Sequence, residues 1–138
     1  MKHVFMDTNI VIDFLADRKP FSLDAAKLFE LSVRGIIKIH ISAISYNNIY
    51  YILRRSLTNN ATIKLLDELS ELSEITDVTK AIIKQSLKTD FKDYEDAIQY
   101  YSALSISKID CIITRNLKDF KRSNLPVLTP SEAINSFV

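Results

Sequence analysis

Glycine and cysteine are nearly absent from this 138-residue chain, which has one of each, Gly35 and Cys111. A single glycine excludes a glycine-rich phosphate loop of the Walker type and a dinucleotide-binding fingerprint. A single cysteine excludes an intrachain disulfide and a cysteine-based metal site, and it fits a reducing compartment. No run approaches the roughly 18 apolar residues of a membrane span, and the first residues lack the pattern of a signal peptide. We therefore expect a cytoplasmic protein with no membrane partner.

The chain also lacks an excess of either charge, because 18 basic and 17 acidic residues leave a net charge of +1. A strongly basic nucleic-acid-binding domain is thereby excluded, so any RNA binding must depend on local patches or on a metal site. Hydrophobic residues make up 47% of the chain and charged residues 25%, which is typical of a globular protein. With no repeat, low-complexity tract or linker, we expect one domain over residues 1–138.

Short apolar runs alternate with longer segments of helical periodicity. The runs predict strands over residues 3–6, 36–41, 74–78, 111–114 and 127–128. The other segments predict helices over residues 9–15, 43 to about 57, 79–87 and 94–105. Three further helices are predicted from a cap at Ser22 to a stop at Gly35, after a cap at Asn60, and from Thr129 onward. Thr129, with Glu132 three residues later, predicts a capping box at the start of the last helix. This alternation predicts an α/β fold with a mostly parallel sheet covered by helices on both faces.

Three acidic residues lie where such a sheet would gather them. Asp7 directly follows the first predicted strand, and Asp96 lies in the first turn of the helix that starts near residue 94. Asp119 lies just past the strand at 111–114. Ligands of parallel α/β sheets bind outside the carboxyl ends of the strands, and Mg²⁺ prefers carboxylate oxygens, waters and substrate phosphate. The pattern therefore predicts a divalent-metal site at that edge.

Each acid also has a structural interpretation. Asp7 is a favourable helix cap, and Asp96 is favourable in a first helical turn. Asp93 and Glu95 share the second interpretation, and we assign them to it. Asp13 is interpreted as part of a helix surface. The apolar run before Asp7 favours a functional role for that residue.

Five segments resemble the PIN domain, in order and over nearly the whole chain: VFMDTNIVIDFL, ISAISYNNIYYIL, DFKDYEDAIQYYSAL, CIITRNLKDF and LPVLTPSEAI. This family includes the VapC-type toxins of bacterial toxin–antitoxin pairs. The resemblance implies a central parallel sheet of four to five strands, ordered 3-2-1-4-5, with helices on both faces. It also implies an endoribonuclease in which acidic residues bind Mg²⁺ or Mn²⁺ and an activated water cuts RNA.

The family's first acid falls on Asp7, with Asn9 in the same motif, and its third acid falls on Asp96. The resemblance therefore implies that Asp7 and Asp96 bind the metal and take part in catalysis. The second acid is missing, because Asn48 stands where many members have Glu. An amide oxygen can ligate a metal without contributing charge. We therefore expect weaker metal binding than in members with four acids, and a loss of activity is the alternative.

The family's fourth region falls on TRNLKDF. Asn116 stands where many relatives have Asp, which leaves Asp119 as the nearest carboxylate and the third expected catalytic acid. Thr114 matches a hydroxyl that relatives carry at the end of this strand. Arg115 is a candidate contact for RNA phosphate, because it directly precedes Asn116. The resemblance also implies a homodimer and a small antitoxin partner.

Three alternatives remain. A non-catalytic PIN module that binds RNA or a protein is favoured by Asn48 and Asn116. A haloacid-dehalogenase-type phosphatase needs a second Asp two residues after the first, where this chain has Asn9. A receiver-like signalling domain needs a pair of acids near the end of the first strand, and that pair is missing.

Overall fold

Five parallel strands form the centre of the molecule in the computed structural model, which describes residues 1–138. The sheet order is β3-β2-β1-β4-β5, as the resemblance implied. The strands are β1 (Lys2–Met6), β2 (Ile37–Ser42), β3 (Glu74–Thr76), β4 (Cys111–Ile113) and β5 (Val127–Leu128). All four strand pairings are parallel, so every strand delivers its carboxyl end to the same edge.

The central strand β1 is buried on both faces. Val4 pairs in register with Ile39 of β2 and with Cys111 of β4, and all three belong to the larger core cluster. Phe5 points to the opposite face, where it packs in a second core with Tyr100. Burial on both sides explains why β1 reads as a continuous apolar run rather than as an alternating strand.

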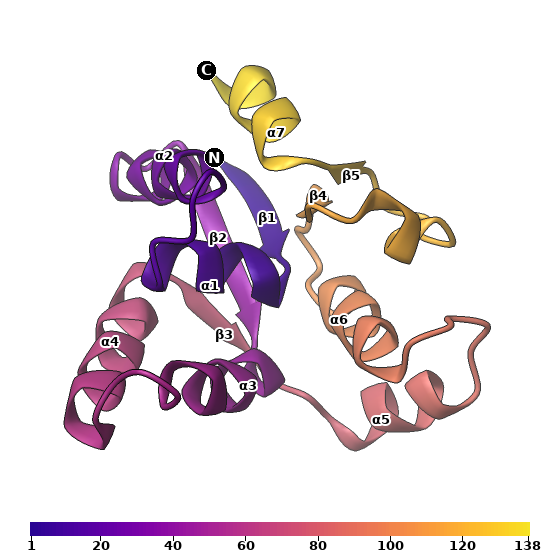
Figure 1. The fold of residues 1–138 in the computed structure, drawn as a ribbon. Helices are drawn as coiled ribbons and strands as arrows, with labels where there is room; N and C mark the ends of the chain where they lie inside the picture. The colour runs from indigo at the N-terminus through magenta and orange to yellow at the C-terminus, as the bar shows by residue number, and fades with distance from the viewer.

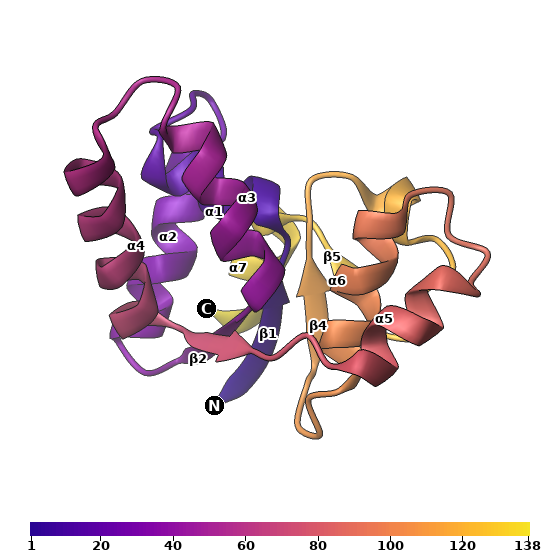
Figure 2. The same ribbon diagram turned by 90° about the horizontal axis from the view of Figure 1, so that it is seen from below.

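Helices cover both faces of the sheet, as predicted (Figures 1 and 2). In Figure 2, α1, α2, α3, α4 and α7 lie on one side of the sheet, and α5 and α6 lie on the other. Their bounds are α1 (Thr8–Leu15), α2 (Ser22–Val33), α3 (Ala43–Leu53), α4 (Asn59–Leu72), α5 (Lys80–Leu87), α6 (Tyr94–Leu104) and α7 (Pro130–Phe137), with a 3₁₀ turn η1 (Leu117–Phe120) after β4. None of these helices is long and apolar enough to cross a bilayer.

Hydroxyl side chains cap four of the helices. Ser42, Thr58, Thr79 and Thr129 each accept a hydrogen bond from a backbone N–H of the first turn. The predicted capping box of α7 is confirmed, because Glu132 in turn accepts a hydrogen bond from the Thr129 N–H at 2.9 Å. The predicted stop of α2 at Gly35 is also confirmed, because this glycine has φ +77° just past the helix end.

Three predicted helix boundaries were wrong. The cap of α4 is Thr58 rather than Asn60, and Ser22 is the first residue of α2 rather than its cap. Helix α3 ends at Leu53, four residues earlier than predicted. There the chain tightens into turns, in which the N–H groups of Arg55 and Ser56 bond to carbonyls three residues back.

Candidate active site

Asp7 leaves the sheet at the carboxyl end of β1 and lies between β4 and α1. Its backbone N–H donates to the Ile113 carbonyl of β4 at 3.0 Å, so the sheet ladder continues to this residue. The residue occupies the N-cap position of α1, but its side chain makes no capping hydrogen bond. The side chain instead accepts a hydrogen bond from the Thr114 hydroxyl at 2.8 Å, and Asp7 is only 6% exposed. The cap interpretation therefore does not account for this carboxylate.

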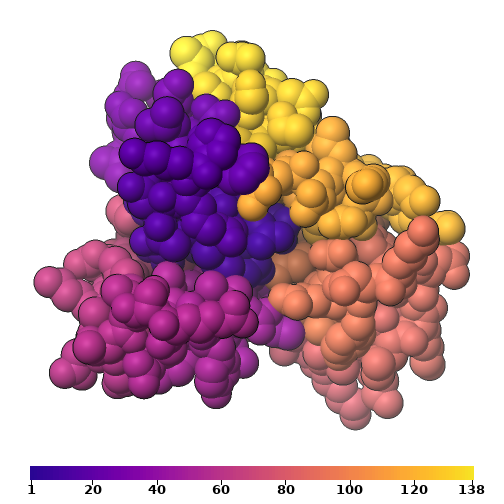
Figure 3. All heavy atoms as spheres, in the orientation of Figure 1, coloured from indigo at the N-terminus to yellow at the C-terminus, as the bar shows by residue number.

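A cavity of about 490 Å³ opens beside Asp7. Its walls come from three helices that start at the carboxyl edge of the sheet: α1, α3 and α6. Figure 3 shows the face where the indigo N-terminal residues meet the magenta residues of α3 and the salmon residues of α6. Eleven residues line it: Asp7, Thr8, Asn9, Ile12, Asn48, Tyr51, Ile52, Asp93, Glu95, Asp96 and Gln99. The structure thus brings together Asp7, Asn9, Asn48 and Asp96, four of the predicted site residues.

Asp96 is a strongly perturbed carboxyl group of this cavity. Its pKa is raised to about 7, chiefly by burial and also by the neighbouring carboxylates of Asp93 and Asp119. Burial also raises the pKa of Asp7, and this outweighs the lowering effect of the hydrogen bond from Thr114. Buried and half-buried carboxylates that repel one another are the electrostatic setting in which a divalent cation is favoured.

Asp119 does not line the large cavity. It lines a smaller cavity of about 310 Å³, which shares Asp93 and Asp96 with the first. Its charge still raises the pKa of both Asp7 and Asp96. The third predicted acid is therefore near the other two but exposed, on the 3₁₀ turn η1.

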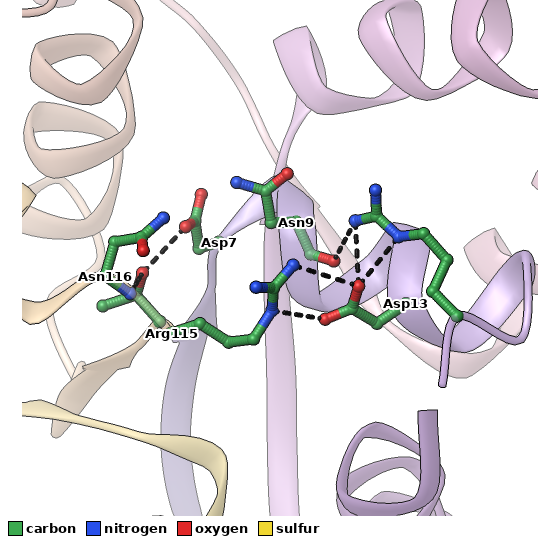
Figure 4. Close-up of polar contacts among 7 residues, drawn as sticks. Asp7, Asn9, Asp13, Arg115 and Asn116 are labelled. Atoms are coloured by element: carbon green, nitrogen blue, oxygen red, sulfur yellow. Dashed lines mark hydrogen bonds and ion pairs between the residues drawn. The ribbon is translucent and has the colours of Figure 1, made fainter. Parts of the chain in front are cut away.

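Thr114 and Asn116 connect the end of β4 to Asp7. The Thr114 hydroxyl, which donates to Asp7, accepts a hydrogen bond from the Asn116 N–H at 3.1 Å. In Figure 4 the Asn116 side chain lies beside that of Asp7. The hydroxyl predicted at the strand end thus holds the Asp7 carboxylate in place, and its own oxygen is fixed by the following loop.

Glu95 is a site residue that the sequence interpretation missed. It is exposed at the start of α6 and accepts a hydrogen bond from the Asn48 side-chain amide of α3. Burial raises the pKa of Glu95, the Asp93 carboxylate raises it further, and the bond from Asn48 lowers it. By contrast, Asp93 caps α6 through its contact with the Asp96 N–H at 3.0 Å, as its structural interpretation predicted.

A buried polar network that the sequence did not reveal joins the three cavity helices. The hydroxyls of Thr8 on α1 and Ser45 on α3 are 2.6 Å apart. The Gln99 amide nitrogen of α6 donates to both, at 2.9 and 3.0 Å. These hydrogen bonds hold together the elements that carry Asn48 and Asp96. The Gln99 amide oxygen is buried without a hydrogen-bond partner, and Gln99 lines the cavity.

Arg115 extends away from the carboxylates of the cavity and toward Asp13 (Figure 4). Its guanidinium donates to the two Asp13 carboxylate oxygens at 2.7 and 3.2 Å, and it lies over the Phe21 ring at 3.8 Å. Arg18 also pairs with Asp13, at 2.8 Å. The assignment of Asp13 to a helix surface was wrong: it is completely buried because two guanidiniums satisfy its charge.

Comparison with protein-family profiles matches residues 3–118 to the PIN domain. The chain belongs to the PIN-domain family. A search among curated proteins finds no match.

Solved structures of toxin–antitoxin proteins have the same fold as this PIN domain. VapBC2 from Rickettsia felis, bound to a DNA fragment from its promoter, has a TM-score of 0.68 at 20% identity, over 92% of this chain and 98% of that one. A toxin–antitoxin complex from Klebsiella pneumoniae has a TM-score of 0.65 at 25% identity, over 92% and 97% of the two chains. VapC20 from Mycobacterium tuberculosis, a sarcin–ricin-loop-cleaving toxin, has a TM-score of 0.61 at 15% identity, over 79% and 86%.

The oxygen donors of this PIN domain suit a hard cation. Carboxylates and amides line the large cavity, whereas histidine and cysteine are absent from it. No three acidic, histidine or cysteine side chains are close enough together to form a metal site by themselves. Mg²⁺ does not require such a cage, because it usually keeps several waters and takes one or two carboxylates. Asp7 and Asp96 are two carboxylates that line this cavity.

Proposed function

We propose that this PIN domain is a Mg²⁺- or Mn²⁺-dependent endoribonuclease and the toxin of a toxin–antitoxin pair. The observation that carries the proposal is the cavity at the carboxyl edge of the sheet, where Asp7 from the end of β1 and Asp96 from α6 come together with raised pKa values. The similarity to VapC20, named for cleaving the sarcin–ricin loop, supports RNA as the substrate.

The cation would be held by the carboxylates of Asp7 and Asp96, with the amides of Asn9 and Asn48 as further oxygen donors in the same cavity. When bound, a divalent cation lowers the pKa of a water and neutralises charge on the phosphate, which favours hydrolysis of the phosphodiester bond. Thr114 orients Asp7 by donating to one of its oxygens. Without the cation, Asp96 is partly protonated at neutral pH because its pKa is about 7.

Asp119 is proposed as an auxiliary acid rather than a metal ligand. It is exposed and lines the smaller cavity, next to the basic side chains of Lys118, Lys121 and Arg122. Phosphate oxygens bind to cationic side chains of this kind, and such contacts position a nucleic acid without reading its sequence. The smaller cavity is therefore the proposed path of the RNA backbone on the Asp119 side.

A non-catalytic PIN module remains the second candidate. It is favoured by Asn48, which lines the cavity and contributes an uncharged amide where many family members place a carboxylate. An inactive module would bind RNA or a protein partner and release no cleavage product.

Cleavage assays distinguish the two candidates. Purified wild type, Asp7→Asn and Asp96→Asn would be incubated with tRNAs and hairpin RNAs in Mg²⁺, Mn²⁺ or EDTA, and with DNA of the same sequence. We expect RNA to be cut by wild type with either metal and to stay intact in EDTA and with both variants. Circular dichroism would establish that the variants are folded. RNA that is bound but uncut by wild type would support the non-catalytic module.

An antitoxin partner and a homodimer are part of the same proposal. Support for the antitoxin comes from the VapBC2 and Klebsiella structures, both of which are complexes of a toxin with its antitoxin. The product of a small adjacent reading frame, added to the assay above, should stop cleavage. Light scattering of the free protein should give twice the mass of the 15.8 kDa chain.

A further inference from the structure

The carboxylate that the family places at position 48 has a substitute in this chain. Asn48 on α3 donates its side-chain amide N–H to Glu95 on α6, across 47 positions of sequence. Both residues line the cavity that contains Asp7 and Asp96. Because the Asn48 amide contacts the Glu95 carboxylate, this carboxylate lies next to the position that a carboxylate on residue 48 would occupy.

We propose that Glu95, held by Asn48, adds a third negative charge beside the cation that Asp7 and Asp96 bind. This inference rests on the proposed function, and it assigns to α6 a charge that other members of the family carry on α3. Glu95 and Asp96, which are consecutive at the start of α6, then both contribute to the same cavity. Glu95 is exposed and Asp96 is half-buried.

A second feature of the cavity wall, independent of the acids, also points to a ligand. Gln99 is 1% exposed and lies one helical turn beyond Glu95. Its amide nitrogen is fully used by Thr8 and Ser45, which fixes the orientation of the amide. Its oxygen is left buried without a donor. A buried acceptor without a donor is unfavourable by itself, and a water bound to a cation is a donor of the kind it lacks.

Glu95 contributes charge rather than a complete cage. No three acidic side chains are close enough together to bind an ion alone, so Glu95 acts on the cation as an additional anion near Asp7 and Asp96. Removal of a group that supports a metal site in this way typically weakens metal affinity by about 10- to 100-fold.

Calorimetric titration of Mn²⁺ into the full-length protein tests this role without depending on activity. The variants are Glu95→Gln, Asn48→Ala and Asp96→Asn. The matched control is Glu68→Gln, which removes one negative charge from an exposed position of α4. We expect wild type and Glu68→Gln to bind Mn²⁺ equally and Glu95→Gln to bind about 10-fold more weakly or worse. Asn48→Ala removes an amide oxygen from the cavity and the hydrogen-bond donor of Glu95 but leaves the Glu95 charge, so it should weaken binding less than Glu95→Gln.

The outcomes separate this inference from the proposed function. If Asp96→Asn loses Mn²⁺ binding while Glu95→Gln binds like wild type, the role of Glu95 is refuted and the metal-dependent nuclease stands. If wild type binds no Mn²⁺, both proposals fail. Thermal melting followed by circular dichroism would check that each variant folds. If Glu95→Gln is unfolded, Asn48→Ala decides, and affinity equal to wild type would overturn the proposal.

Discussion

Replacing Asp13 with alanine should destabilise the protein strongly, although this residue does not line the cavity. The side chain of Asp13 is 1% exposed and accepts hydrogen bonds from two guanidiniums, those of Arg18 and Arg115. Removal of one partner from a buried ion pair costs about 3–5 kcal/mol, because the remaining charge loses its counterion. The Arg18 and Arg115 side chains are 40% and 25% exposed, so water compensates in part, and we expect the lower end, about 3 kcal/mol.

Urea denaturation measures this change. For small proteins the free energy of unfolding falls by about 1–3 kcal/mol per molar urea, so a loss of 3 kcal/mol lowers the midpoint by about 1–3 M. Arg18→Ala is the control, because Asp13 keeps Arg115 and the lost pair is partly exposed; we expect a loss of about 1 kcal/mol or less.

The double variant Asp13→Ala/Arg115→Met distinguishes an unpaired charge from lost packing. It removes both members of the closest pair, so part of the stability lost in Asp13→Ala should return. The reasoning is refuted if Asp13→Ala costs less than about 1 kcal/mol, since a buried, doubly paired carboxylate would then contribute no more than a surface pair. It is also refuted if the double variant is less stable than Asp13→Ala.

Two further predictions concern the carboxylates of the cavity. The pKa of Asp96 is raised from 3.8 to about 7, so protonation favours the native state, and that stability is lost as pH rises from 3.8 to about 7. In EDTA, Asp96→Asn should therefore melt at a higher temperature than wild type at pH 8, with a smaller difference at pH 5; a constant difference would contradict this. Thr114→Val removes the hydroxyl that donates to buried Asp7, and urea denaturation should show a loss of about 1–3 kcal/mol. An unchanged midpoint would mean that this hydrogen bond contributes nothing to stability.

Local patterns in the sequence were sufficient to predict most elements and their order along the chain. The capping box at Thr129, the glycine stop at Gly35 and the apolar run before Asp7 each depend on a few adjacent residues. The errors occurred where two local signals compete, as with Thr58 and Asn60 at the start of α4. Both residue types are good caps, and the extended backbone at Thr58 selects the threonine.

The candidate site was predicted in part for the same reason. Asp7 and Asp96 were identified because an acid at a strand end or helix start is visible in the sequence and because the PIN resemblance indicated both. Glu95 was interpreted only as a favourable acid in a first helical turn. Its hydrogen-bond partner, Asn48, is 47 residues away in the sequence, so no local pattern indicates the contact. Thr8, Ser45 and Gln99 showed no signal, because isolated polar residues on helices are ordinarily exposed.

The sequence by itself determined the strands, the capping box at Thr129, the parallel architecture and the absence of a glutamate at position 48. Tertiary structure alone decided which side chains meet. It buried Asp13 between two guanidiniums, directed Arg115 away from the carboxylates, and brought Glu95 to Asn48. The physical reason is range: periodicity and capping act over a few residues, whereas burial and charge pairing depend on segments that only the folded sheet brings together.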